Sequence, residues 1–343
     1  MKKLHDISKV YVFSPWGKTT GGIELLHQLV DYLRNRQLEA YIYYYENPSA
    51  QVPEVYSKYN IATATQVDDA KQTVLVLPEI CFHVSAYYKE SQIVLWWLSV
   101  DNYYHREKKH IPLYELFSYS KIYGMKQLWH RLMRLFKLQW SIRPRFSIKE
   151  SIKKTYIHAY QSEYANLHLQ HRGVVELYPL KDYINTDFVS DEVCTNREPN
   201  ILYNPKKGIK FTRKLIKSAP DLKFIPLQNL SRAELQHLFA TSMLYVDFGS
   251  HPGMDRLPRE AAVNGCCIVT GMQGAAANAT DIPISDSYKF DESNASVAEI
   301  ICRIREVLSD YEKHSKAFGP YRQRIMGEEQ AFYKQIDELF QLR

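Results

Sequence analysis

The sequence lacks several patterns that would place it in a specialised class of protein. Its five cysteines form no Cys-x-x-Cys pair and no Cys/His spacing typical of a metal site, and their odd number does not suit a disulfide framework. The first residues, MKKLHDISKV, contain no apolar signal core. The longest clean apolar run, IVLWWL, is far shorter than the roughly 20 residues of a membrane span. We therefore expect a cytoplasmic protein that does not cross a membrane.

The composition is that of a folded chain with more than one hydrophobic core. Hydrophobic residues make up 45% and charged residues 24% of the 343 positions, which excludes wholesale disorder. Short apolar runs alternate with amphipathic stretches in both halves, a pattern typical of strand–helix units around parallel sheets. The predicted fold class is α/β, with two doubly wound Rossmann-like domains facing across a cleft.

The domain boundaries follow from this alternation. The polar stretch SDEVCTNREPN separates the two halves and is the expected linker. We predict an N-terminal domain over residues 1–185, a C-terminal domain over residues 198–325, and a final helix over residues 326–343.

The positive charge is concentrated in one segment. Residues 121–149 contain four lysines, four arginines and no acidic residue, so the rest of the chain is slightly acidic although the net charge is +6. Within residues 121–146, apolar side chains recur every three or four positions, as in a basic amphipathic helix that lies on an anionic bilayer. The alternative is that this stripe packs on its own domain. RNA binding is disfavoured, because no nucleic-acid-binding motif accompanies the segment.

Glycines follow the first predicted strand. In SPWGKTTGGIELL, Gly17, Gly21 and Gly22 form a turn that leads into a helix near Ile23. The turn is neither a Gly-x-Gly-x-x-Gly nor a Walker loop. Backbone N–H groups at a helix start can nevertheless bind a phosphate, and glycine lets it come close. A tight turn without a ligand is the alternative.

Two lysines stand at a strand-to-helix turn of the second half. In YNPKKG, Lys206 and Lys207 follow a predicted strand, at the sheet edge where doubly wound domains bind ligands. Either ammonium can neutralise a diphosphate, and a solvated basic turn is the alternative interpretation.

Charged residues also crowd the stretch DFGSHPGMDRLPREAAVNGCCIVTG. Glu260 begins a predicted helix, and its carboxylate can accept bonds from the two vicinal hydroxyls of a ribose. Arg256 and Arg259 suit a phosphate. The alternative is that these arginines pair with Asp255 or Glu260.

These stretches, in this order, resemble the GT-B glycosyltransferases, and in particular family four, which uses nucleotide-sugar donors. GGIELL is similar to the family's GG.E loop, QSEYANLHL to its S-E-Y/F motif, and YPLKDYINTDF loosely to its P-N-G-V-D turn. YNPKKG keeps the last two residues of G-R-x-x-x-x-K-G. HPGMDRLPREAAVNGCCIV keeps Leu257-Pro258, Glu260-Ala261, Gly265 and Ile268-Val269 of the family's paired-glutamate motif.

The resemblance implies a donor site on the C-terminal domain and a final helix that crosses back to the first domain. Glu260 matches the second glutamate, which contacts the ribose, and backbone groups around Leu227–Leu230 would contact the base. We predict these donor-binding residues: Gly21, Gly22, Lys206, Lys207, Asn229, His251, Asp255, Arg256, Arg259 and Glu260.

The chain departs from the family's pattern at one important position. Pro252 stands eight positions before Glu260, where the family has its first, sugar-binding glutamate. His251 or Asp255 can substitute for it. Because the family retains the configuration of the sugar, this gap leaves retention or inversion open.

Two carboxylates follow strands of the first half. Asp101 comes directly after IVLWWLSV, and Glu79 comes directly after VLVLP. Either could be the general base that activates an acceptor hydroxyl, as inverting members need, and Asp101 is the first choice. The alternative is a helix cap or a partner for an arginine.

The predicted function is sugar transfer from a nucleotide diphosphate sugar to a glycan or lipid-linked glycan in bacterial surface polysaccharide synthesis, lipopolysaccharide or capsule. We expect no cofactor, no metal and no nucleic acid, and peripheral attachment to the inner face of the cytoplasmic membrane through residues 121–146. The alternatives are a nucleotide-sugar epimerase on the same fold and a non-catalytic GT-B-like binding subunit.

Overall fold

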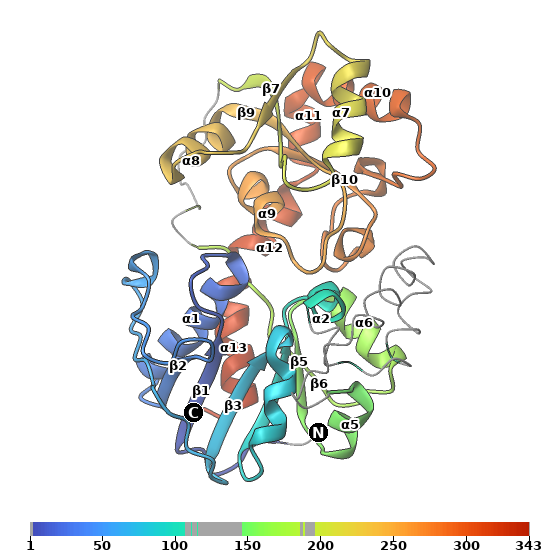
Figure 1. Ribbon diagram of the computed structural model, residues 1–343. Coiled ribbons are helices and arrows are strands. Elements are labelled where there is room, and N and C mark those ends of the chain that lie inside the picture. Colours follow the sequence, from blue (N-terminus) through green and yellow to red (C-terminus); the bar gives the residue numbers. More distant parts are fainter. Residues whose placement is uncertain are drawn as a thin grey trace, which may run out of the picture. The chain divides into compact units, whose positions relative to one another are not determined.

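The structure is a computed structural model that describes residues 3–106, 111, 115, 146–185, 188 and 196–342. The chain divides into two compact units (Figure 1). Unit 1 comprises Met1–Gln161, Ala165–Leu180 and Tyr333–Arg343, and unit 2 comprises Ser162–Tyr164 and Lys181–Phe332. The predicted membrane-binding segment, 121–146, lies outside the described residues except for Phe146.

Unit 1 is built on a parallel sheet with the strand order β2-β1-β3-β4-β5-β6. Its strands are β1 (Lys9–Ser14), β2 (Glu39–Tyr44), β3 (Thr73–Pro78), β4 (Gln92–Trp97), β5 (Ile157–Tyr160) and β6 (Leu177–Pro179). Its described helical segments are α1 (Gly21–Asn35), η1 (Glu54–Tyr56), η2 (Glu79–Tyr87), α2 (Val100–Arg106) and α5 (Ile148–Lys153). Two further helices, α6 (Glu163–His171) and α13 (Glu328–Phe340), begin in unit 2 and end in unit 1.

Strands β1, β3 and β4 of unit 1 are buried almost without alternation. All six residues of β3, TVLVLP, are buried, and so are five of the six in β1 and β4. A strand with two buried faces needs helices on both sides of the sheet, which is the arrangement of a parallel α/β domain. Helix α1 buries an apolar face that includes Ile23, Leu26 and Leu29.

Unit 2 has a parallel sheet with the order β11-β10-β9-β7-β8. Its strands are β7 (Glu198–Tyr203), β8 (Lys223–Pro226), β9 (Ser242–Asp247), β10 (Cys267–Gly271) and β11 (Lys289–Phe290). The described helical segments that lie wholly in this unit are α7 (Ile209–Ser218), α8 (Arg232–Thr241), α9 (Arg256–Val263), η4 (Ala275–Ala277), η5 (Asp286–Tyr288), α10 (Val297–Ser309), α11 (Tyr311–Lys316) and α12 (Gly319–Met326). Ser231 and Glu234 form a capping box at the start of α8.

In both units the strand order reverses beside the first strand. The first strand of unit 2 is β7, and its neighbours are the second and third, β8 and β9. In unit 1 the first strand, β1, lies between β2 and β3 in the same way. The carboxyl ends of strands at such a reversal are where doubly wound domains bind ligands. In unit 2 this position is held by the loops after β7 and β9.

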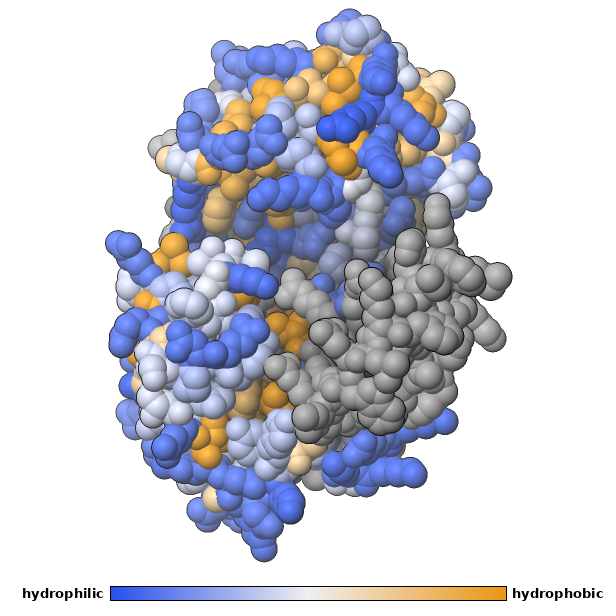
Figure 2. Space-filling view, in the orientation of Figure 1, coloured by the Kyte–Doolittle hydropathy of each residue, from blue (hydrophilic) through white to orange (hydrophobic). Residues whose placement is uncertain are grey.

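The predicted fold class, two doubly wound Rossmann-like α/β domains, is confirmed. On the face drawn in Figure 2, hydrophobic residues of the described surface are interspersed with hydrophilic ones, which is usual for a surface in water. Among the helices that the structure describes, none is long and apolar enough to cross a membrane.

Candidate functional site

The site in unit 2 centres on an ammonium group between two carboxylates at the carboxyl edge of the sheet. Lys207 follows β7, Asp247 ends β9, and Asp255 immediately precedes α9. The Lys207 Nζ donates to Asp247 Oδ2 at 2.8 Å and also to Asp255 Oδ2. Residues from two strand ends and a helix start are thereby joined at the reversal of strand order.

Charge, rather than burial, decides the ionisation of this cluster. Burial alone would lower the pKa of Lys207, but the Asp247 and Asp255 carboxylates more than offset it, and its pKa is raised. Burial alone would likewise raise the pKa of Asp247, but Lys207 and His251 hold it below its ordinary value. Lys207 and Asp247 are therefore charged at neutral pH.

His251 is fully buried beside this cluster. Its Nδ1 lies 3.0 Å from the carbonyl oxygen of Gly249, which can only accept, so Nδ1 carries the hydrogen. Its Nε2 lies 3.3 Å from Asp247 Oδ2. The His251 backbone carbonyl accepts from Ala275 N at 2.8 Å, which joins the loops after β9 and β10.

Two glycines let the loops after β7 and β9 touch backbone to backbone. Gly208 and Gly249 have φ values of +59° and +95°. A Cβ atom on Gly208 would lie 2.0 Å from the carbonyl oxygen of Phe248, and one on Gly249 would lie 2.7 Å from Gly208 N. Gly249 N also donates to the carboxylate of Glu292, after β11. Only glycine fits these two positions.

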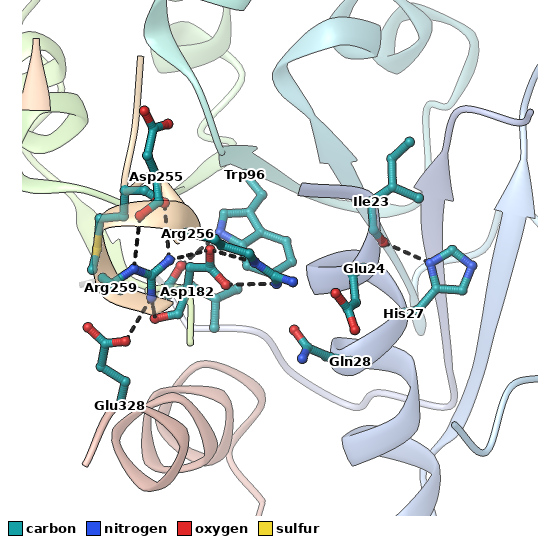
Figure 3. A network of polar contacts seen from close by, with 12 residues as sticks. Ile23, Glu24, His27, Gln28, Trp96, Asp182, Asp255, Arg256, Arg259 and Glu328 are labelled. Carbon is teal, nitrogen blue, oxygen red and sulfur yellow. Dashed lines mark hydrogen bonds and ion pairs between the residues drawn. The ribbon is translucent and has the colours of Figure 1, made fainter. Parts of the chain in front are cut away.

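Arg259 is committed to bonds within unit 2. Its Nη2 donates to Asp182 Oδ2 and its Nη1 to Glu328 Oε2, each at 2.7 Å, as Figure 3 shows. Its remaining N–H groups donate to the backbone carbonyls of Asp255, Asp182 and Met254. All five guanidinium hydrogens are therefore used, and none is left for a phosphate. The prediction that Arg259 binds the donor does not fit this geometry, because the guanidinium is 1% exposed and saturated.

Arg256 shares one of these partners. Its Nε and Nη2 donate to the two Asp182 oxygens at 3.3 and 3.1 Å (Figure 3). Asp182 and Glu328 were not predicted as site residues, since each is remote from the arginines in sequence and no local pattern marks it. The Asp255 carboxylate pairs with Lys207.

The other predicted donor residues lie at the same edge of the sheet. Glu260 is in the second turn of α9 and is 6% exposed. Lys206, beside Lys207, has an exposed side chain, and its backbone N–H donates to Asn204 Oδ1 at 3.0 Å. Asn229 is exposed between β8 and α8, with a φ of +54°.

The predicted residues of unit 1 follow its own strand ends. Glu79 begins η2 after β3 and accepts a bond from Leu98 N at 3.2 Å. Asp101 lies in the first turn of α2, and its carbonyl accepts from His105 Nδ1 at 2.6 Å. Both carboxylates are buried. Gly21 and Gly22 are the first two residues of α1, so the predicted helix start is where the structure has it.

Comparison with known proteins shows a likeness of fold. No protein-family model matches the chain, and no curated protein sequence matches it. Its structure is similar to sucrose-phosphate synthase of Thermosynechococcus elongatus, with a TM-score of 0.65 and 9% identity over 97% of this chain and 98% of that one. It is also similar to HepE of Anabaena in complex with UDP-glucose, with a TM-score of 0.56 and 11% identity over 96% and 98% of the two chains.

A third similar structure is longer than this chain. A variant of Staphylococcus aureus TarM, in complex with fondaparinux, alpha-GlcNAc-glycerol and UDP, has a TM-score of 0.53 and 10% identity over 80% of this chain. The match spans 56% of that protein, little more than half of its length. These likenesses show the GT-B fold that such glycosyltransferases share, and at these identities they show the fold alone.

Proposed function

We propose that this protein is a glycosyltransferase that moves a sugar from a nucleotide diphosphate sugar to a glycan acceptor. The observation that carries the proposal is the convergence of Lys207, Gly208 and Asp247 at the reversal of strand order in unit 2, where the loop after β9 leads into α9. This is the position where a doubly wound domain binds a nucleotide. The HepE structure contains UDP-glucose and the TarM structure contains UDP, which supports a donor of the same chemistry here.

Glu260 is the proposed ribose contact. It lies on α9, whose preceding residue, Asp255, is tied to the loop after β7 through Lys207. Gly208 and Gly249 bring the loops after β7 and β9 together, and the loop after β9 leads into α9. Lys206 is exposed and is proposed to meet the donor diphosphate, and Asn229 and its neighbours to meet the base.

The acceptor side is proposed to lie on unit 1, where Asp101 is the general base and Glu79 the second candidate. The base takes the proton of the acceptor hydroxyl, and the hydroxyl oxygen forms a bond to the anomeric carbon. The bond from that carbon to the diphosphate oxygen breaks, and the nucleotide diphosphate leaves. This direct displacement inverts the anomeric configuration.

The acceptor is proposed to be a growing glycan, lipid-linked, of a bacterial surface polysaccharide such as lipopolysaccharide or capsule. The support is the basic amphipathic pattern of residues 121–146, which suits an anionic membrane surface on which a lipid-linked acceptor would lie.

Titration calorimetry with nucleotide diphosphates tests the donor site. Glu260→Ala is expected to weaken binding of the preferred nucleotide at least tenfold, because the ribose hydroxyls lose their acceptor. The matched control is Glu198→Ala, since Glu198 is an exposed glutamate at the amino end of β7, away from the proposed site. Unchanged affinity in Glu260→Ala would remove the ribose role.

A transfer assay tests the proposed base. Asp101→Asn is expected to lower turnover about 10²- to 10⁴-fold, the usual contribution of a general base, and to leave nucleotide affinity unchanged. Full turnover in Asp101→Asn together with loss of turnover in Glu79→Gln would show that Glu79 is the general base instead.

A further inference from the structure

The proposed donor site has a shortage of available positive charge. A departing diphosphate must be stabilised by cations or by N–H donors. Among the four predicted cations, Lys207 is held by Asp247 and Asp255, and Arg256 and Arg259 are held by Asp182. Lys206 is the one of the four for which the described residues offer no carboxylate partner. The resemblance in sequence implies that the donor binds without a metal. In the structure, however, three of the four predicted cations are bound by carboxylates, so little positive charge is available to a diphosphate.

The same loops gather a set of metal-ligating atoms. One side-chain oxygen of Asp247, one of Asp255 and a ring nitrogen of His251 all lie within 4.8 Å of one another. Asp247 and His251 are 2% and 0% exposed. In spite of this burial, Asp247 Oδ1 and His251 Nε2 have no hydrogen-bond partner among the residues that the structure describes. Buried polar atoms in proteins are nearly always paired, so two such atoms in one cluster point to a missing ligand.

The hydrogen bonding of His251 matches that of a metal-binding histidine. Because Nδ1–H donates to the Gly249 carbonyl, Nε2 is the ring nitrogen that faces Asp247. Nε2 lies 3.3 Å from a carboxylate oxygen of Asp247, close enough for one cation to bind both atoms. Metal-bound histidines donate their second ring N–H to a carbonyl in the same way.

We propose that Asp247, His251 and Asp255 bind a divalent cation, and that the ammonium of Lys207 exchanges with it. Two carboxylates and one imidazole suit an ion that accepts both oxygen and nitrogen ligands, such as Mn²⁺. Entry of the ion would release Lys207 from its carboxylates. If the proposed function holds, on which this part of the inference rests, the ion and the freed ammonium together would neutralise the donor diphosphate.

Manganese binding without nucleotide tests the site itself. Electron paramagnetic resonance of free Mn²⁺, titrated with the full chain, is expected to show one bound ion per chain. Lys207→Met is expected to bind at least tenfold more tightly, because the competing charge is removed. Asp255→Asn and His251→Gln are expected to bind at least tenfold more weakly, while Asp221→Asn, an exposed carboxylate elsewhere in unit 2, binds like the wild type.

Three results would overturn the proposal. One is no binding to the wild-type chain at millimolar Mn²⁺, even if Lys207→Met binds, since the lysine would then be the permanent cation. Another is wild-type affinity in both Asp255→Asn and His251→Gln, which would mark the binding as adventitious. If Asp221→Asn bound Mn²⁺ as weakly as the Asp255 and His251 variants, the binding would also be adventitious. Because His251 is buried, circular dichroism verifies that its variant is folded, and the partly exposed Asp255 gives the second variant.

Nucleotide titrations in Mn²⁺ and in EDTA separate this inference from the proposed function. Binding that is at least tenfold tighter in Mn²⁺ supports both. Equal nucleotide binding in both solutions overturns the role of the ion and leaves the transferase proposal standing. Mn²⁺ binding without any nucleotide binding leaves the metal site standing and overturns the proposed function.

Discussion

At the scale of single residues, unit 2 surrounds the buried guanidinium of Arg259 with carboxylates and backbone carbonyls. Arg259 donates two bonds to the carboxylates of Asp182 and Glu328 and three to backbone carbonyls. Removing one member of such a group leaves the others buried and unpaired, which costs far more than losing an exposed ion pair. The large effects of substitution are therefore expected at these buried positions.

Arg259→Ala is expected to lower the free energy of unfolding by about 3–5 kcal/mol, because Asp182 and Glu328 lose their common partner. Urea denaturation measures the change. Arg305→Ala is the matched control, since Arg305 makes a similar two-bond pair with Asp221 on the surface and should change stability little. Equal losses in the two variants would contradict the structural role of Arg259.

His158 makes the stability of unit 1 dependent on pH. Burial lowers its pKa to about 4, and Trp97 Nε1–H donates to its Nδ1 at 3.0 Å, so the folded ring is neutral. The unfolded chain takes up a proton near pH 6.5 and the folded chain only near pH 4. The free energy of unfolding therefore falls between these values as the pH is lowered, by about 1.4 kcal/mol per pH unit for this group.

The measurement is urea denaturation of the wild type and of His158→Gln at pH 7 and pH 5. The wild type is expected to lose about 2 kcal/mol more than the variant over this interval. The same pH dependence in both proteins would show that His158 is not the titrating group.

At the scale of elements, the site depends on how the loops after β7 and β9 approach each other. Gly208 begins the turn into α7, and a side chain there would meet the Phe248 carbonyl. The left-handed backbone alone can be tolerated at a cost of roughly 1–2 kcal/mol, but the clash cannot be relieved without moving a loop.

Gly208→Ala is therefore expected to weaken nucleotide binding at least tenfold and to destabilise the protein by more than the backbone strain alone. Gly173→Ala is the matched control, because Gly173 has a φ of +82° and nothing within 4 Å of the added carbon. The control should lose about 1–2 kcal/mol of stability and bind nucleotide normally. Normal nucleotide binding by Gly208→Ala would mean that the loops can separate without harm to the site. Calorimetry and urea denaturation give the two readouts.

At the scale of the whole molecule, the fold could be predicted because its signals are local. The uninterrupted apolar run of β3, the buried face of α1 and the Ser231–Glu234 capping box are each readable within a few residues. The site was readable only in part. Asp182 and Glu328 are 77 and 69 positions away from Arg259, so no sequence spacing shows that they occupy it. The sequence therefore predicts that Arg259 binds a phosphate, or pairs with a nearby acid, whereas in the folded chain its partners are Asp182 and Glu328.

The ion pairs of Lys207 could not be predicted for the same reason. Its partners Asp247 and Asp255 are 40 and 48 positions away, and the sequence showed only a basic turn. Asp281 is a similar case, because its carboxylate accepts the N–H groups of Glu163 and Tyr164 at the start of α6. The sequence shows where the charged residues are, but which of them pair depends on the folded structure.

The central claim is that the carboxyl edge of unit 2 binds a nucleotide diphosphate through Glu260. Thermal unfolding with UDP, GDP, dTDP and CMP, each with Mn²⁺ and with EDTA, tests it most directly, because a ligand that binds only the folded state raises Tm. The account predicts that one of these nucleotides raises the Tm of the wild type, and raises it much less in Glu260→Ala. No shift with any of them, or an equal shift in the two proteins, would contradict it.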